Sequence, residues 1–103
     1  SPNREVDTTD SWEIKQGAIG AHKDREKIEA TNEESEVAIT VKEQPNGVEL
    51  QFMTLEENLP GGYDIMHRKE FNSVDTAVSE LERYAAMYDH EGTWFFEGAP
   101  LLH

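Results

Sequence analysis

The sequence predicts an α+β fold, an antiparallel meander sheet of four to five strands with one long amphipathic helix packed on one face. Three observations lead to this prediction. Residues 71–92 carry apolar side chains at helical spacing between a capping signal and a glycine. Residues 37–53 alternate apolar and polar side chains on both sides of a turn signal. An aromatic run with high strand propensity, residues 94–96, follows the predicted helix.

The chain of 103 residues is long enough to form one domain with a modest core. Its composition changes sharply at residue 37, where a polar segment gives way to alternating β-branched residues. We therefore expect residues 1–36 to form a polar N-terminal arm or linker. Residues 37–103 are expected to form a compact β-β-β-α-β domain.

Within the arm, residues 12–15 alternate apolar and charged side chains, which predicts a short strand. We expect Trp12 to anchor this strand to the core, and the alternative is an exposed aromatic residue in a binding surface. Residues 21–36 are almost wholly polar and leave two alternatives open. One is a short exposed helix over residues 24–30, stabilised by local charge pairs, and the other is a flexible linker.

The hairpin is the clearest strand signal. Residues 37–42 and 48–53 each alternate apolar and polar side chains, so both strands present one apolar face. Between them, Pro45 fixes its φ angle and Asn46-Gly47 tolerates positive φ, which together favour a tight turn. A second turn over residues 56–62, rich in glycine, precedes a third predicted strand.

The third strand is predicted over residues 63–68 and leads into the helix. Asn72 and Ser73 can both cap the start of the helix and Asp75 suits its first turn, while His90 suits its last turn. Gly92 supplies the left-handed residue that ends a helix. After it, residues 93–97 are predicted to add a fourth strand alongside the sheet.

The net charge of −13 is the main compositional constraint on function. Nucleic-acid phosphates and anionic membranes both require clusters of Lys and Arg, so we expect no direct nucleic-acid or membrane partner. The surplus of acid is explained by solubility, by adaptation to high salt, or by a face that binds a basic protein, including imitation of nucleic-acid charge. Without a signal or membrane-spanning pattern, a cytoplasmic location is the default expectation.

No motif predicts a catalytic, cofactor or metal site. The chain has no cysteine, and no two of its four histidines have the i, i+4 spacing of a helical metal site. No calcium loop, phosphate-binding loop or serine nucleophile elbow is present in the sequence. The alternative of a small enzyme or ligand-binding domain would use a cleft near Tyr63, His67 and Glu97.

A protein-binding surface is the favoured functional prediction. The outer side of the helix carries more acidic than basic side chains, and the three consecutive aromatic residues must point to both faces of a strand. Met53 and Met66 are expected on the strand faces opposite the core, where methionine suits an adaptable contact surface. The candidate partner-binding residues are Asp75, Glu82, Met87, Asp89, Glu91, Trp94, Phe95 and Phe96.

We therefore predict a non-enzymatic, acidic protein-interaction module that engages a basic partner. Its most concrete form is an inhibitor or adaptor of a nucleic-acid-binding protein, of the kind carried by phages or mobile elements. A structural homodimer subunit, paired through the aromatic run, is a further alternative because one helix covers only one side of such a strand.

Overall fold

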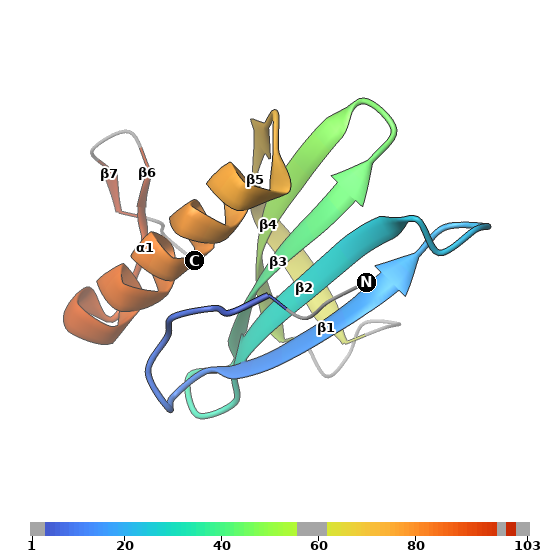
Figure 1. The fold of residues 1–103 in the computed structure, drawn as a ribbon. Coiled ribbons are helices and arrows are strands. Elements are labelled where there is room, and N and C mark those ends of the chain that lie inside the picture. The colour runs from blue at the N-terminus through green and yellow to red at the C-terminus, as the bar shows by residue number, and fades with distance from the viewer. Residues whose placement is uncertain (1–3, 56–61, 97–98, 101–103) are drawn as a thin grey trace.

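The computed structural model describes residues 4–55, 62–96 and 99–100 of the chain. Figure 1 shows a sheet with a single long helix beside it. Along the sequence the elements are β1 (Glu13–Ile19), β2 (Arg25–Asn32), β3 (Val37–Gln44), β4 (Gly47–Leu55), β5 (Tyr63–Phe71), α1 (Val74–Glu91), β6 (Phe95–Phe96) and β7 (Ala99–Pro100).

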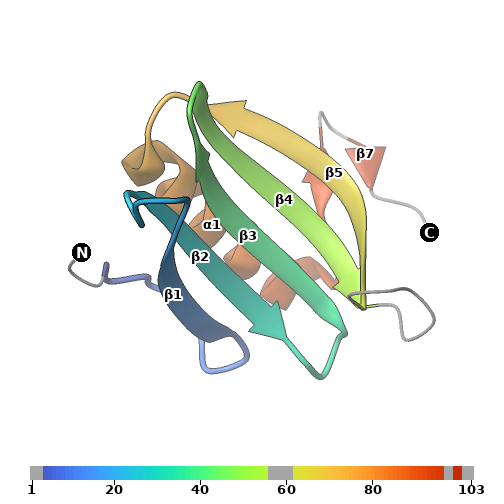
Figure 2. The ribbon, with the colours of Figure 1, turned by 90° about the vertical axis from the view of Figure 1, so that its right-hand side faces the viewer.

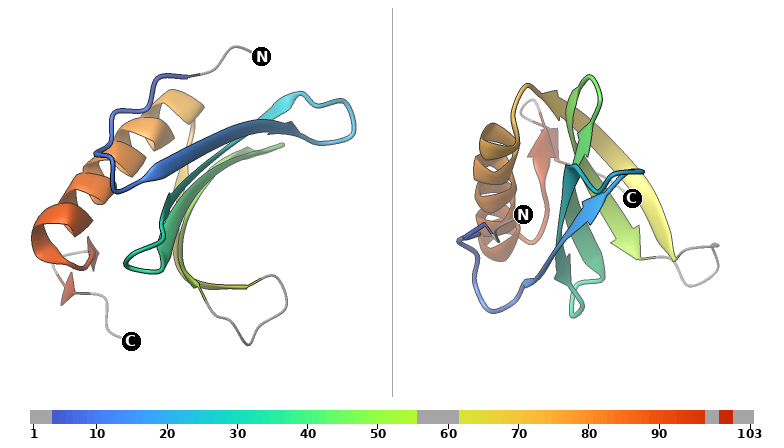
Figure 3. Two further views of the ribbon diagram at one scale, coloured as in Figure 1. Left: turned by 90° about the horizontal axis from the view of Figure 1, so that it is seen from below. Right: turned by 45° about the vertical axis from the view of Figure 1, so that its right-hand side comes forward.

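Strands β1 to β5 form one sheet in which each strand pairs antiparallel with the next in sequence. Helix α1 contacts β3, β4 and β5 and lies on one face of this sheet, as Figures 2 and 3 show from three directions. The predicted α+β fold, with a meander sheet and one helix packed on it, is therefore confirmed.

Both alternatives that the sequence left open for residues 21–36 are wrong, because this segment contains strand β2. Arg25–Asn32 form a strand in the sheet rather than a helix or a linker. Ile28, Ala30 and Asn32 are buried and lie opposite the apolar positions of β3. The alternation of buried and exposed positions is weak in the sequence, because the buried positions include a small alanine and an asparagine. Pairing with the apolar strand β3 favours strand formation here more than the composition of the segment does.

Helix α1 begins and ends where the sequence predicts. Ser73 is the N-cap, and its Oγ accepts a hydrogen bond of 3.2 Å from the backbone N–H of Thr76. At the other end Gly92 has a φ of 72° and donates its N–H to the carbonyl of Tyr88 at 2.8 Å. Within the described ranges, no helix combines the length and the apolar character needed to cross a membrane.

The core lies between α1 and the inner face of the sheet. Phe52 of β4 is fully buried, and its ring centroid lies 4.9 Å from that of Tyr84, 5.2 Å from Trp94 and 4.8 Å from Phe96. These tilted, edge-to-face geometries are the favoured arrangement of aromatic pairs. Trp12 is 4% exposed, which confirms that it anchors the N-terminal segment to the core.

The segment after the helix differs from the prediction. Instead of joining the main sheet, Phe95–Phe96 pair with Ala99–Pro100 as a separate two-stranded ribbon. Trp94 turns into the core, and its Nε1 donates a hydrogen bond of 3.0 Å to the carbonyl of Tyr84. This contact fixes the start of the aromatic run against α1, while Phe95 is exposed and Phe96 is half-buried.

Replacing Phe52 by alanine should lower the free energy of unfolding by about 3–5 kcal/mol, because it removes the ring shared by three aromatic neighbours. Urea denaturation measures the change. Ile65→Ala is the control, since Ile65 is 36% exposed and its loss should cost about 1 kcal/mol or less. Equal losses in the two variants would contradict a core organised around Phe52.

Candidate protein-binding site

The acidic side of α1 carries three carboxylates at a regular interval. Asp75, Glu82 and Asp89 are each seven residues apart, so they lie on one face of the helix, two turns from one another. We call these three residues the acidic stripe. Residues 4–11, which we call the strap, run along this stripe before the chain enters β1.

The strap supplies hydrogen-bond donors to the stripe. The backbone N–H of Asp7 donates to Oε2 of Glu82 at 2.8 Å. The Oγ1 hydroxyl of Thr9 donates to Oδ2 of Asp89 at 2.8 Å, and Nε1 of Trp12, the residue that follows the strap, donates to Oδ1 of the same carboxylate at 3.1 Å. These charge-assisted hydrogen bonds hold the strap against the acidic stripe.

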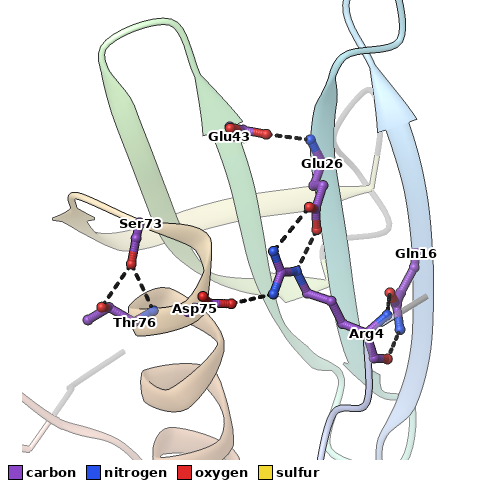
Figure 4. Close-up of polar contacts among 7 residues, drawn as sticks. All are labelled: Arg4, Gln16, Glu26, Glu43, Ser73, Asp75 and Thr76. Atoms are coloured by element: carbon purple, nitrogen blue, oxygen red, sulfur yellow. Dashed lines mark hydrogen bonds and ion pairs between the residues drawn. The ribbon is translucent and has the colours of Figure 1, made fainter. Parts of the chain in front are cut away.

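Arg4 joins the strap to both layers of the fold (Figure 4). Its Nε lies 2.6 Å from Oε2 of Glu26 in β2, and its Nη2 donates to Oε1 of the same carboxylate at 3.1 Å. The remaining nitrogen, Nη1, contacts Asp75 at the start of α1. The hydrogen bond to Glu26 is the main cause of a raised Arg4 pKa, so the guanidinium stays charged. The Gln16 side chain of β1 makes two hydrogen bonds to the Arg4 backbone: its Oε1 accepts from the Arg4 N–H at 2.8 Å, and its Nε2 donates to the Arg4 carbonyl at 2.6 Å.

The acidic stripe is therefore engaged within the chain itself. Asp75, Glu82 and Asp89, which sequence analysis assigned to a partner, here hold the strap. Glu91 is exposed at the end of α1. Met87 is half-buried, and its Sδ accepts a hydrogen bond of 3.3 Å from the Phe95 backbone N–H.

The three aromatic candidates lie in different surroundings. Trp94 is 1% exposed and belongs to the core, whereas Phe95 is 36% exposed. Phe96 is half-buried and stacks on His67, with 4.0 Å between ring centroids. His67 is also in ring contact with Phe52, so it packs at the edge of the core.

The structure describes only part of the cleft that a small enzyme or ligand-binding domain would use near Tyr63, His67 and Glu97. Glu97 and the side chain of Tyr63 lie outside the described residues. Among the residues that the structure does describe, no group of three or more His, Asp or Glu side chains is arranged to hold a metal ion.

The sheet face turned away from α1 is a second candidate surface, which we call the open face. Figure 2 looks onto it, with the helix behind the strands. Strand pairing places five of the chain's nine Lys and Arg residues on this face, with four acids. Its charged side chains are Glu13, Lys15, Arg25, Lys27, Glu29, Lys42, Glu49, Arg68 and Glu70.

At one end of the open face lies a hollow of about 370 Å³, which we call the carboxylate hollow. It is lined by Glu13, Lys15, Glu29, Thr31, Glu33, Glu36 and Leu55. Glu13 lies 4.0 Å from Lys15, the one basic residue of this lining. In the described part of the chain, the carboxylates of Glu29, Glu33 and Glu36 have no hydrogen-bond or ion-pair partner.

Thr40 lies in the middle of the open face, between Glu29 of β2 and Gln51 of β4. It is 1% exposed, and its Oγ1 has no hydrogen-bond partner among the described residues. A buried hydroxyl without a partner costs stability. The open face therefore contains an unsatisfied polar group next to unpaired carboxylates.

Sequence analysis missed the open face, apart from placing Met53 opposite the core. Four of the seven lining residues of the carboxylate hollow belong to residues 21–36, where no strand was predicted. The signal that was present is the alternation of Lys27, Glu29 and Thr31 with Ile28 and Ala30.

Comparisons of the chain with known protein families, with curated proteins and with solved structures found no match. The arrangement itself indicates what this surface is suited for. Unpaired carboxylates around an open hollow attract ammonium or guanidinium groups, and the apolar side chain of Leu55 in the same lining can contact their aliphatic stems.

Replacing Arg4 by alanine should loosen the strap, because it removes the contacts with Glu26 and Asp75. We expect faster hydrogen exchange at the Asp7 amide and a loss of about 1 kcal/mol in stability. Glu5→Ala, in the same strap and exposed, is the matched control. Unchanged exchange at Asp7 in Arg4→Ala would show that the strap is held without this arginine.

Replacing Thr40 by valine should raise the free energy of unfolding by about 1 kcal/mol, because the buried hydroxyl has no partner to lose. Chemical denaturation measures the effect. Thr31→Val, at a half-buried position of the same face, should change stability by about 0.5 kcal/mol or less. A destabilised Thr40→Val protein would refute the assignment of an unpaired hydroxyl.

Proposed function

We propose that this chain is a non-enzymatic, acidic protein-interaction domain, and that it binds a basic segment of a partner protein on its open face. The single observation that carries the proposal is the carboxylate hollow, in which three of the four carboxylates have no partner within the described residues. Binding of a cation to these carboxylates is favoured, because no existing contact with a described residue has to be broken first.

The contrast with the acidic stripe supports this choice of surface. Each carboxylate of the stripe already accepts a hydrogen bond or ion pair from the strap. A basic partner would have to displace the strap before it could use them. At the carboxylate hollow, no described residue forms a hydrogen bond or ion pair with the carboxylate of Glu29, Glu33 or Glu36, so no such contact has to be displaced there.

The surroundings of the hollow also fit a protein segment. Leu55 lines the hollow, and Ile65, at 36% exposure, lies on the same face of the neighbouring strand. A partner segment that combines Lys or Arg with apolar side chains can therefore fill both parts of this surface. A free metal ion would use only the carboxylates.

The biological form of the proposal is an inhibitor or adaptor of a basic, nucleic-acid-binding protein. A net charge of −13 gives long-range attraction to such a partner and repels nucleic acid. Occupation of a lysine- or arginine-rich surface by this domain would then compete with nucleic acid for the same residues.

Charge reversal in the hollow tests the proposal. In the full chain, Glu33→Lys and Glu36→Lys should each weaken binding of a short Lys/Arg-rich peptide by about tenfold, which corresponds to ~1.4 kcal/mol, as measured by calorimetric titration. Binding should also fall as salt is raised, because exposed charges are screened over roughly 8 Å at physiological ionic strength.

Glu34→Lys is the matched control. Glu34 lies in the same turn between β2 and β3 and makes the same change in net charge, but it does not line the hollow. Its peptide affinity should fall much less than that of the two lining variants. If all three variants lose affinity equally, binding follows net charge alone and the site is refuted.

A further inference from the structure

The basic end of the open face carries two lysines in direct opposition. Lys27 of β2 and Lys42 of β3 are register partners, and we call them the lysine pair. Like charges placed opposite each other on neighbouring strands destabilise a sheet. In the described part of the chain neither ammonium group has a carboxylate within ion-pair distance.

The neighbours of the lysine pair explain why it stays uncompensated. On one side, Gly17 of β1 lies opposite Lys27 and contributes no side chain. On the other side, Glu49 lies opposite Lys42. Its carboxylate, however, pairs with Arg68 at 3.6 Å and accepts a hydrogen bond of 2.5 Å from the Gln51 amide. The lysine pair therefore has no counter-ion among the described residues, although the chain has 22 acidic residues.

The space next to the lysine pair is open. A hollow of about 250 Å³ is lined by Lys15, Gln16, Gly17, Lys27 and Glu29. An added Cβ at Gly17 would meet no atom within 4 Å, so nothing in the described chain fills the position beside Lys27. Among the described residues, an external carboxylate therefore has access to the Lys27 side of the lysine pair.

The open face is thus divided along its strands. Thr31, in the lining of the carboxylate hollow, lies four residues along β2 from Lys27, a separation of about 13 Å at the usual rise per strand residue, and Lys15 and Glu29 line both hollows between them. The unpaired hydroxyl of Thr40 lies between the two. A ligand that matches this surface needs charges of both signs, arranged along the direction of the strands.

We propose that the partner segment on the open face is bipolar, with basic side chains in the carboxylate hollow and an acidic side chain against the lysine pair. This inference rests on the proposed function and deepens it, because it specifies the charge pattern of the partner. It also explains how a strongly acidic domain selects among basic proteins. An all-basic segment satisfies one end of the face and is repelled by the other.

The test uses three synthetic helical peptides of about twelve residues, long enough to span ~18 Å. The bipolar peptide has acids in its first turn and Lys and Arg in its last turn, which also suits the helix dipole. The mixed peptide has the same composition with the charges interleaved. The all-basic peptide replaces the acids by glutamine.

Affinities for the full chain are measured by calorimetry at physiological ionic strength, where long-range attraction to the net charge is screened. We expect the bipolar peptide to bind about tenfold more tightly than either of the others. Lys27→Gln combined with Lys42→Gln should remove this advantage, and either single variant should remove part of it. Lys23→Gln, in the exposed turn before β2, is the matched control and should leave the preference intact.

The outcomes separate this inference from the proposed function. If the all-basic peptide binds best and depends on Glu33 and Glu36 but not on the lysine pair, the bipolar pattern is wrong and the proposed function stands. If no peptide depends on Glu33 or Glu36, the proposed function fails as well. If sedimentation shows a dimer that the same lysine variants dissociate, a second copy of the chain occupies the face and the inference is overturned.

Discussion

One helix covers one face of a five-stranded sheet, and this constraint organises the molecule. Helix α1, the Trp12 anchor and the Trp94 side chain all pack against the inner face, where Phe52 lies at the centre of the aromatic contacts. The other face receives no described segment, so long charged and polar side chains must cover its strands. That is why Ala38 and Thr40 are buried on a face without a second layer.

The acidic side chains on α1 and those near the turn between β2 and β3 have different surroundings. The stripe on α1 is used to fasten the strap, with each carboxylate accepting donors from a segment distant in sequence. The strap is itself acidic apart from Arg4, so its attachment depends on directed hydrogen bonds more than on net charge. The carboxylates near the turn between β2 and β3 have no such use, and they give the open face its unpaired charge.

Sequence patterns predicted the elements whose signals are local. The cap at Ser73, the left-handed Gly92 and the Asn46-Gly47 turn each fix a boundary by chemistry that neighbouring residues supply. Strand β2 escaped prediction because Asn32 takes a core position and Ala30 gives a weak apolar signal, and only the β3 partner makes the pattern recognisable. The ribbon of β6 and β7 escaped because the hydrogen bond from Trp94 to Tyr84, a tertiary contact, directs the chain there.

The candidate site also combines features that local sequence patterns predict with features that depend on tertiary contacts. The seven-residue spacing of the acidic stripe is visible in the sequence, but its engagement by the strap depends on contacts between residues more than 70 positions apart. The carboxylate hollow depends on the register of β1 with β2, which no local pattern specifies. Charge composition therefore led to the hypothesis of a basic partner, whereas the surface proposed for it could be found only in the structure.

The most direct measurement is a map of backbone amide hydrogen exchange in the full chain, with and without a bound basic partner segment. A partner on the open face should protect amides of β1, β2 and the turn that carries Glu33 and Glu36, while the Asp7 amide of the strap keeps its protection. Faster exchange at Asp7 together with protection along α1 would place the partner on the acidic stripe and contradict this account.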